Sequence, residues 1–154
     1  MSRFSAELLN IGFATGIASY WDAYPGQESA ARIVIPLLVA TNLRIHAILD
    51  TGAPWCVFDP RMAKSFIEDD QNPLFSPVRL LIRGQWYSGS LYRIPCQLIA
   101  EIGESLDVEA TVFVPQLRAG ESWPHPNFIG LDGFLNRLRI AIDPAENALY
   151  FGPV

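Results

Sequence analysis

The chain has 154 residues, the length of one domain, and its 50% hydrophobic and 18% charged residues exclude an intrinsically disordered protein. Its 11 Lys and Arg and 16 Asp and Glu give a net charge of -5, without a basic tract. We therefore expect no nucleic-acid partner, because binding to phosphates requires clustered cations. Two Cys and two His are too few for a disulfide scaffold or a typical zinc site. We expect neither a metal nor an organic cofactor.

The beginning of the sequence was tested for a membrane span and for a signal peptide. The run 8–21 carries no charge, but polar residues interrupt it and it is shorter than the ~20 apolar residues that cross a bilayer. A signal peptide starts with basic residues, whereas Arg3 is soon followed by Glu7. We expect a cytoplasmic protein that has no membrane partner.

Turn-forming residues at 22–31 separate an N-terminal arm of uncertain structure, residues 1–32, from a domain at 33–154. Within the domain, apolar or alternating segments rich in β-branched residues predict short strands. The predicted strands are 33–40, 43–49, 78–83, 86–94, 108–114, 139–143 and 148–152. Strands in this number favour a mainly-β barrel or sandwich.

Two short helices and one hairpin complete the predicted elements. One helix begins after Asp59-Pro60, because Asp is a good N-cap and Pro suits the first helical turn. The other spans 131–138, where Leu and Phe recur at helical spacing. Gly84-Gln85 predicts the turn of the hairpin at 78–94.

The segment with the clearest chemical content follows the strand 43–49. Asp50 comes directly after this apolar strand and is followed by Thr51-Gly52-Ala53. The strand places the carboxylate at the edge of the core, and the glycine allows the backbone to turn sharply. Taken alone, the segment also fits an ordinary turn at the end of a strand.

A second motif, Phe128-Ile129-Gly130, precedes the helix predicted at 131–138. With the Asp50 motif and the hairpin between the two, it resembles the retropepsin family of single-lobe aspartic proteases, of the cellular and bacterial rather than the retroviral kind. The resemblance extends over residues 33–152. It implies a closed, acid-protease-like β-barrel with a flap hairpin and one or two short helices.

The resemblance also implies roles for individual residues. Asp50 would be catalytic, and Thr51, Gly52 and Ala53 would form the active-site loop. Phe128, Ile129 and Gly130 would support that loop, and Arg83, Gly84, Gln85 and Trp86 would form the flap and bind substrate. Retroviral members carry an ion pair where this chain has Pro54-Trp55 and Leu131, so we expect an apolar contact to replace it.

A catalytic mechanism of this kind requires two carboxylates, one as acid and one as base. The chain supplies one Asp-Thr-Gly, so the resemblance implies a homodimer in which two Asp50 carboxylates share a proton and activate water to hydrolyse a peptide or protein substrate. We expect the apolar strand 148–152 to be an exposed edge that a second copy covers. The alternative function is a non-catalytic dimeric module, for binding or assembly, that keeps the same fold.

Overall fold

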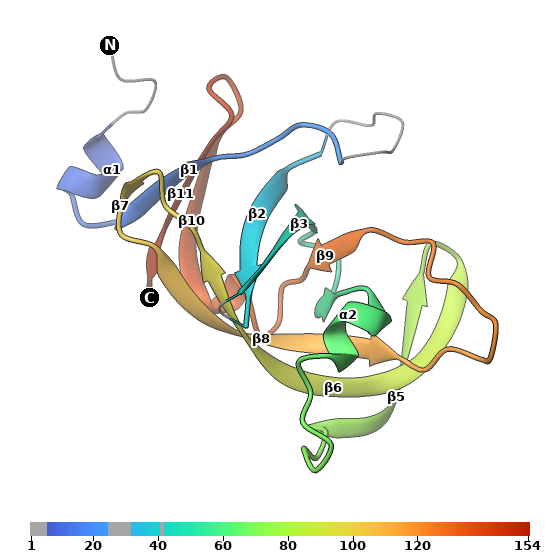
Figure 1. The fold of residues 1–154 in the computed structure, drawn as a ribbon. Coiled ribbons are helices and arrows are strands. Elements are labelled where there is room, and N and C mark those ends of the chain that lie inside the picture. The colour runs from blue at the N-terminus through green and yellow to red at the C-terminus, as the bar shows by residue number, and fades with distance from the viewer. Residues whose placement is uncertain (1–5, 25–31, 41) are drawn as a thin grey trace.

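A computed structural model describes residues 6–24, 32–40 and 42–154. Its strands are β1 (Gly16–Ser19), β2 (Val34–Val39), β3 (Leu43–Leu49), β4 (Cys56–Val57), β5 (Phe75–Ile82), β6 (Gln85–Leu98), β7 (Ile102–Gly103), β8 (Leu106–Pro115), β9 (Asn127–Ile129), β10 (Leu138–Asp143) and β11 (Ala148–Pro153). Its helices are α1 (Glu7–Asn10) and α2 (Pro60–Lys64), with one 3-10 helix, η1 (Leu135–Arg137). The predicted mainly-β class is confirmed (Figure 1).

Six strands close into a barrel. They pair in the order β2-β3-β9-β4-β8-β6, and β6 pairs again with β2 through the register Leu37↔Leu98. The strand β5 is added outside this ring and pairs with β6 as a hairpin. Because β3 and β9 run parallel, their carboxyl ends lie side by side, which brings the two sequence motifs together.

A second sheet of four strands lies beside the barrel, in the order β10-β11-β1-β7. The prediction that 148–152 is an exposed edge is wrong, because β11 lies between β10 and β1. The strand β1 comes from the N-terminal arm, and it fills the position that we expected a second copy to fill. Leu149 and Phe151 of β11 are buried as a result.

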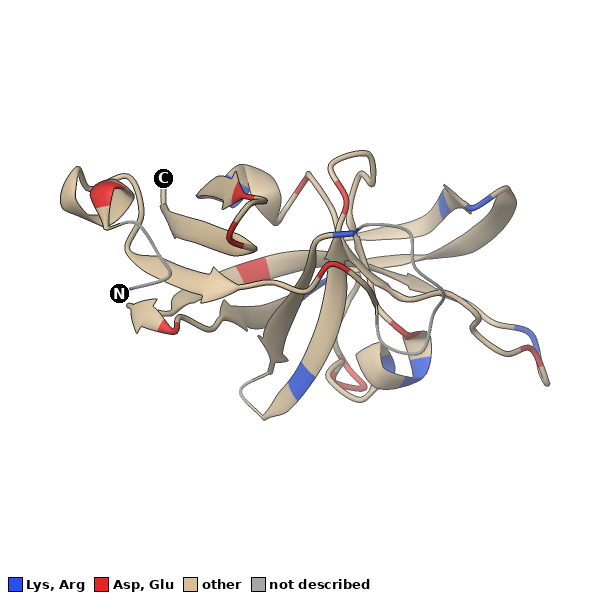
Figure 2. Cartoon of the chain, turned by 90° about the horizontal axis from the view of Figure 1, so that it is seen from above, with Lys and Arg blue, Asp and Glu red and all other residues tan. Residues whose placement is uncertain are grey.

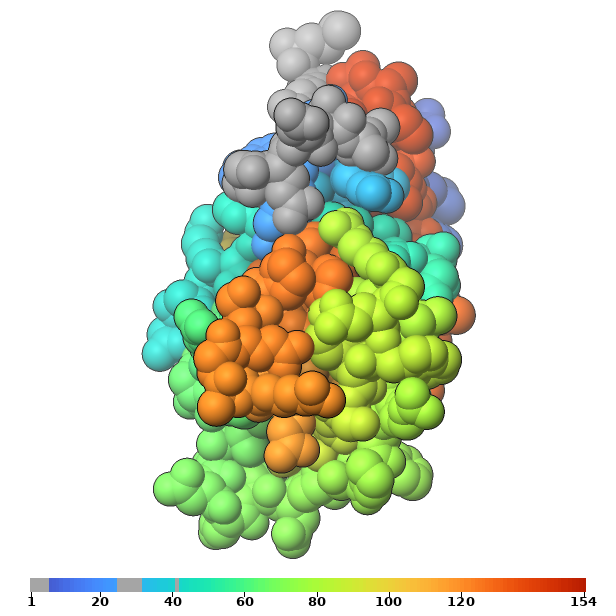
Figure 3. Space-filling model, turned by 90° about the vertical axis from the view of Figure 1, so that its right-hand side faces the viewer, coloured from blue at the N-terminus to red at the C-terminus, as the bar shows by residue number. Residues whose placement is uncertain are grey.

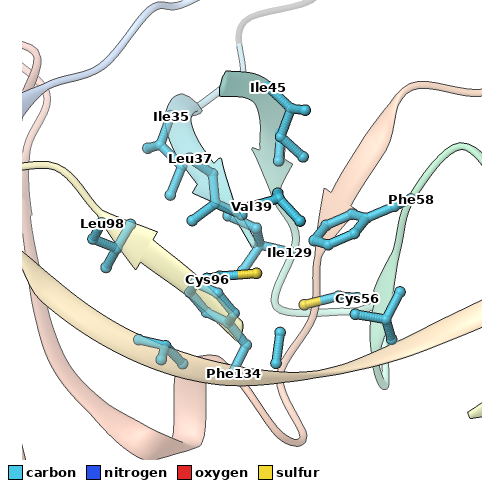
Figure 4. Close-up of a cluster of buried hydrophobic side chains, with 14 of the residues drawn as sticks. Ile35, Leu37, Val39, Ile45, Cys56, Phe58, Cys96, Leu98, Ile129 and Phe134 are labelled. Carbon is cyan, nitrogen blue, oxygen red and sulfur yellow. The ribbon is translucent and has the colours of Figure 1, made fainter. Parts of the chain in front are cut away.

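The main core fills the barrel (Figure 4). It also includes Leu149 and Phe151 of the four-stranded sheet. The alternating residues of β8, Val108, Ala110, Val112 and Val114, are all buried, as the pattern predicts, but Phe113 on the other face is buried as well. Cys56 and Cys96 are free thiols in this core. Burial raises the pKa of Cys56 to about 12 and also raises the pKa of Cys96, so both behave as apolar side chains.

Two local predictions need correction, and one is confirmed. The hairpin turn is Arg83-Gly84 rather than Gly84-Gln85, and both residues have positive φ, 48° and 84°, which suits a two-residue turn between twisted strands. The helix at 131–138 is reduced to η1, because Gly133 has a φ of 78° that a continuing helix does not allow. The Asp59 carboxylate accepts the Arg61 N–H at 2.9 Å and caps α2 as expected.

Candidate active site

Asp50 leaves the end of β3 at the mouth of the barrel. Its backbone N–H donates to the carbonyl oxygen of Ile129 at 2.9 Å. Its Oδ1 accepts the N–H of Gly52 at 2.9 Å, and its carbonyl oxygen accepts the N–H of Ala53 at 3.2 Å. The side chain of Asp50 is half-buried, whereas Thr51 and Gly52 are exposed. The loop therefore fixes one carboxylate at the surface and orients it through its own backbone.

The segment 128–130 lies directly against this loop. Gly130 must lack a side chain, because a Cβ there would overlap the carbonyl group of Trp55. Immediately after it, the N–H of Leu131 donates to the Ala53 carbonyl at 2.8 Å. The next N–H donates to the Pro54 carbonyl at 2.7 Å. The two predicted motifs thus lie in direct contact.

These backbone hydrogen bonds also correct one expectation. We expected an apolar contact of Leu131 to replace the missing ion pair, but this side chain is 48% exposed. The backbone hydrogen bonds from the segment after Gly130 to Ala53 and Pro54 hold the two segments together instead. No charged side chain takes part in them.

Asn127 supports the loop from below, and the sequence analysis missed it. Its Oδ1 accepts the N–H of Asp59 at 2.8 Å, and its Nδ2 donates to the carbonyl oxygen of His46 at 3.2 Å. It therefore joins β3, β9 and the start of α2. A polar residue at the start of the short apolar strand β9 was the available signal.

A cleft of about 640 Å³ opens above the Asp50 loop. Its lining includes Asp50, Gly52 and Ala53 from the loop, Leu80, Leu81, Ile82 and Arg83 from the β5–β6 hairpin, and Tyr20, Asp22, Arg32, Pro144 and Asn147 on other walls. Of the four residues assigned to the flap, Arg83 is in this lining, and Gly84, Gln85 and Trp86 are not. The β5 strand of the hairpin therefore faces the Asp50 loop. The alternation of apolar and polar residues in the sequence does not determine which of the two strands of a hairpin does so.

The β5–β6 hairpin is held by the loop 116–126. The hydroxyl of Tyr87 lies 2.8 Å from Nε2 of His125, and the Trp123 ring packs against both residues, with centroids 5.0 and 4.9 Å away. Figure 3 shows this loop (orange) beside the hairpin (yellow-green). Burial, with a smaller contribution from Arg83, lowers the pKa of His125, so the neutral imidazole is favoured there.

The charges of the described residues are spread over many elements (Figure 2). In that part of the chain, no three His, Cys, Asp or Glu side chains lie close enough to hold a metal ion. The helices that the structure describes are too short or too polar to cross a membrane.

Comparisons with known proteins show a likeness in fold rather than in sequence. No protein-family model matches the sequence, and no curated protein matches it. The fold is similar to the crystal structure of a retropepsin-like aspartic protease from Rickettsia conorii, with a TM-score of 0.51 and 15% sequence identity. The match covers 87% of this chain and 97% of the other. At this identity the likeness concerns the fold.

Proposed function

We propose that this protein is an aspartic endopeptidase that works as a homodimer, in which Asp50 of each copy supplies one catalytic carboxylate. The observation that carries the proposal is the position of Asp50 in a cleft between its own loop and the β5–β6 hairpin, which would act as the flap. The likeness in fold to a protein named as an aspartic protease supports the same activity.

The proposed reaction begins with two adjacent carboxylates that hold one proton between them, because two neighbouring negative charges repel each other. The ionised carboxylate takes a proton from water, and the water oxygen attacks the carbonyl carbon of the peptide bond. The protonated carboxylate gives its proton to the carbonyl oxygen. When the C–N bond breaks, the carboxyl group that took the proton from water gives it to the leaving nitrogen, and the other carboxylate regains a proton from a hydroxyl of the tetrahedral intermediate. The products are a carboxylic acid and an amine, and the pair of carboxylates again holds one proton.

The substrate that suits this cleft is an extended peptide with apolar side chains. Ile48, Leu80 and Ile82 contribute apolar surface to its walls, and an extended chain gains backbone hydrogen bonds from the neighbouring loop and hairpin. Arg83 lines the cleft, and its guanidinium lies 5.5 Å from the centre of the Phe128 ring. The contact with the Phe128 ring would hold the positive charge of Arg83 next to a bound substrate.

The direct test is cleavage of a mixed peptide library by the purified protein and by Asp50→Asn. We expect the wild type to cleave and the variant to lose activity by orders of magnitude while remaining folded. Asp132→Asn is the matched control, because this exposed side chain needs only an oxygen to accept from Asn136. Full cleavage by a folded Asp50→Asn protein would contradict the proposal. Peptide binding without cleavage by the wild type would favour the non-catalytic module.

A further inference from the structure

The cleft above the Asp50 loop contains two arginine side chains that have no carboxylate partner. Arg32 and Arg83 both line it, together with the carboxylates of Asp22 and Asp50. Neither arginine forms an ion pair with a carboxylate of the described residues. A guanidinium is a planar fork of N–H donors that matches the two oxygens of a carboxylate. The cleft therefore offers guanidinium groups that the described part of the chain leaves unpaired.

The side chain of Arg83 is directed toward the floor of the cleft. Its guanidinium lies 5.5 Å from the centre of the Phe128 ring, and Phe128 is a buried residue of β9 that also lines the cleft. Arg79 of the same hairpin has different surroundings. Its guanidinium lies 4.7 Å from the centre of the Trp86 ring, and neither of these two residues lines the cleft. Of these two arginines, Arg83 is the one whose charge belongs to the cleft.

The backbone conformation at Arg83 is unusual for an arginine. Arg83 is the first residue of the two-residue hairpin turn and has a φ of 48°, in the left-handed region where Gly, Asn and Asp are favoured. The requirements of the turn therefore do not account for an arginine at this position. A residue that is held in a sparsely populated conformation at the wall of a cleft indicates a role for its side chain there.

A carboxylate that binds at this place would belong to the substrate. Arg83 is exposed in the free protein, and a peptide that enters the cleft would exclude water from its guanidinium, which strengthens the attraction to a carboxylate. Next to the proposed pair of Asp50 carboxylates, an acidic group of the substrate would instead be repelled. The acidic group should therefore lie away from the cleaved bond, at a position beside Arg83 and Phe128.

We propose that Arg83 gives the cleft a preference for peptides that carry a carboxylate at one fixed position near the cleaved bond. An Asp or Glu side chain and the C-terminus of a short peptide both supply this group. The inference rests on the proposed function, because it names the class of substrate for the same cleft. Its evidence is the unpaired guanidinium and its position on the Phe128 ring, which are independent of a second copy of Asp50.

Matched peptides provide the first test. The probes are short peptides of Leu, Val and Ala, blocked at both ends, in which a single Glu is moved through the sequence and compared with Gln at each position. We expect kcat/KM of the wild type to be roughly fivefold or more higher for Glu at one position. Arg83→Gln should abolish this difference, and Arg83→Glu should favour Lys at the same position. A merely structural role of Arg83 would affect all peptides alike and would not reverse the preference.

Two other arginines provide the controls. Arg79→Gln changes an arginine of the same hairpin that lies outside the cleft, so the preference for Glu over Gln should remain that of the wild type. Arg32→Gln removes the other arginine of the cleft and should also retain the preference at this position. A preference that survives in Arg83→Gln, or that Arg32→Gln abolishes, would show that the assignment to Arg83 is wrong. Equal kcat/KM for Glu and Gln at every position would overturn the proposal as well.

Peptide binding separates this inference from the proposed peptidase. Asp50→Asn keeps the oxygen that accepts the Gly52 N–H, and its affinity for fluorescently labelled probes can be measured by anisotropy. It should bind the preferred Glu peptide roughly fivefold or more tightly than the Gln peptide, and the added change Arg83→Gln should remove the difference. If the wild type cleaves no peptide but this difference in affinity is found, the inference holds and the proposed peptidase is wrong. Cleavage and binding that do not distinguish Glu from Gln would overturn the inference alone.

The two sources of the carboxylate are distinguished by the end group of the probe. The Gln peptides are compared as C-terminal amides and as free acids, with the wild type and with Arg83→Gln. A preference for the free acid that disappears with Arg83 would assign the bound carboxylate to the end of the peptide. A preference for Glu in the blocked peptides that disappears with Arg83 would assign it to an acidic side chain.

Discussion

The hydroxyl of Tyr87 lies 2.8 Å from Nε2 of His125, so one side-chain contact joins the β5–β6 hairpin to the segment that enters β9. The strand β9 carries Ile129, whose carbonyl oxygen accepts the N–H of Asp50. The hairpin above the cleft and the loop below it are therefore fixed to the same short strand. A substitution of His125 should therefore affect both the β5–β6 hairpin and the Asp50 loop.

The protonation of His125 should make stability depend on pH. Burial and Arg83 lower its pKa in the folded state, while in the unfolded chain it titrates near 6.5. Below that pH the unfolded state binds more protons, so the free energy of unfolding should fall as the pH is lowered. Urea midpoints measured from about pH 7.5 to about pH 5 should fall less steeply for His125→Gln, which cannot titrate. The same dependence on pH in the wild type and in His125→Gln would contradict this prediction. Burial also lowers the pKa of His46, but both proteins contain His46, so its effect cancels in the comparison.

Gly130 should tolerate no side chain. A Cβ there overlaps the Trp55 carbonyl, and the backbone on both sides is held by hydrogen bonds, so neither segment can move away cheaply. We expect Gly130→Ala to reduce the free energy of unfolding by several times the ~1 kcal/mol of an average substitution. Gly120→Ala is the comparison for backbone strain without a clash, since this glycine has a φ of 78° and open space around it, whereas Gly130 does not have a positive φ. A shift in thermal midpoint for Gly130→Ala no larger than that for Gly120→Ala would contradict a severe clash at Gly130.

Much of the barrel could be predicted because each strand carries its own pattern. β2, β3, β8, β10 and β11 follow from apolar runs and alternation close to where the structure has them. The short strands β4, β7 and β9 could not be found this way, because two or three residues carry no periodicity. These three short strands form because the backbone of a neighbouring strand pairs with them through hydrogen bonds. The strand β1 lies in an arm for which the sequence indicated no structure, and its role depends on β11, far along the chain.

The centre of the candidate site was predictable, and its surroundings were less so. Asp50 and Gly130 are recognisable because their two motifs occur together, with a hairpin between them, whereas the Asp50 segment alone also fits an ordinary turn at the end of a strand. The hairpin contributes to the cleft mainly through Leu80 and Ile82 of β5, whereas the sequence analysis assigned the residues at and after the turn, including Trp86, which does not line it. Asn127 was missed because its partners, Asp59 and His46, are distant in sequence.

Removal of the Asn127 side chain should loosen the support of the Asp50 loop. Asn127→Ala leaves the Asp59 N–H and the His46 carbonyl without their partner in a half-buried place, which costs about 1–3 kcal/mol. Asn136→Ala is the matched control: this exposed amide also makes two hydrogen bonds, but water can replace them. Chemical denaturation of both variants should show the larger loss for Asn127. A smaller loss there would contradict its supporting role.

Truncation of the C-terminus should unfold the protein rather than merely dissociate it. Residues 148–152 are buried, with Phe151 fully enclosed, and loss of one such aromatic side chain alone costs about 3–5 kcal/mol. We therefore expect a chain that ends at 147 to lose its folded circular dichroism spectrum. A chain without Val154, which is 78% exposed, should keep it. A folded monomer that lacks 148–154 would contradict the central place of β11.

Mixing active and inactive subunits should reveal whether the two carboxylates come from two copies. When wild type and Asp50→Asn exchange freely at equal amounts, about one quarter of the dimers contain two wild-type chains. A mixed dimer has one carboxylate, which cannot act as acid and base together, so specific activity per wild-type chain should fall by about half. Dilution should lower it further as dimers dissociate. Activity that stays proportional to the wild-type chain alone, at every ratio and dilution, would show that one copy suffices.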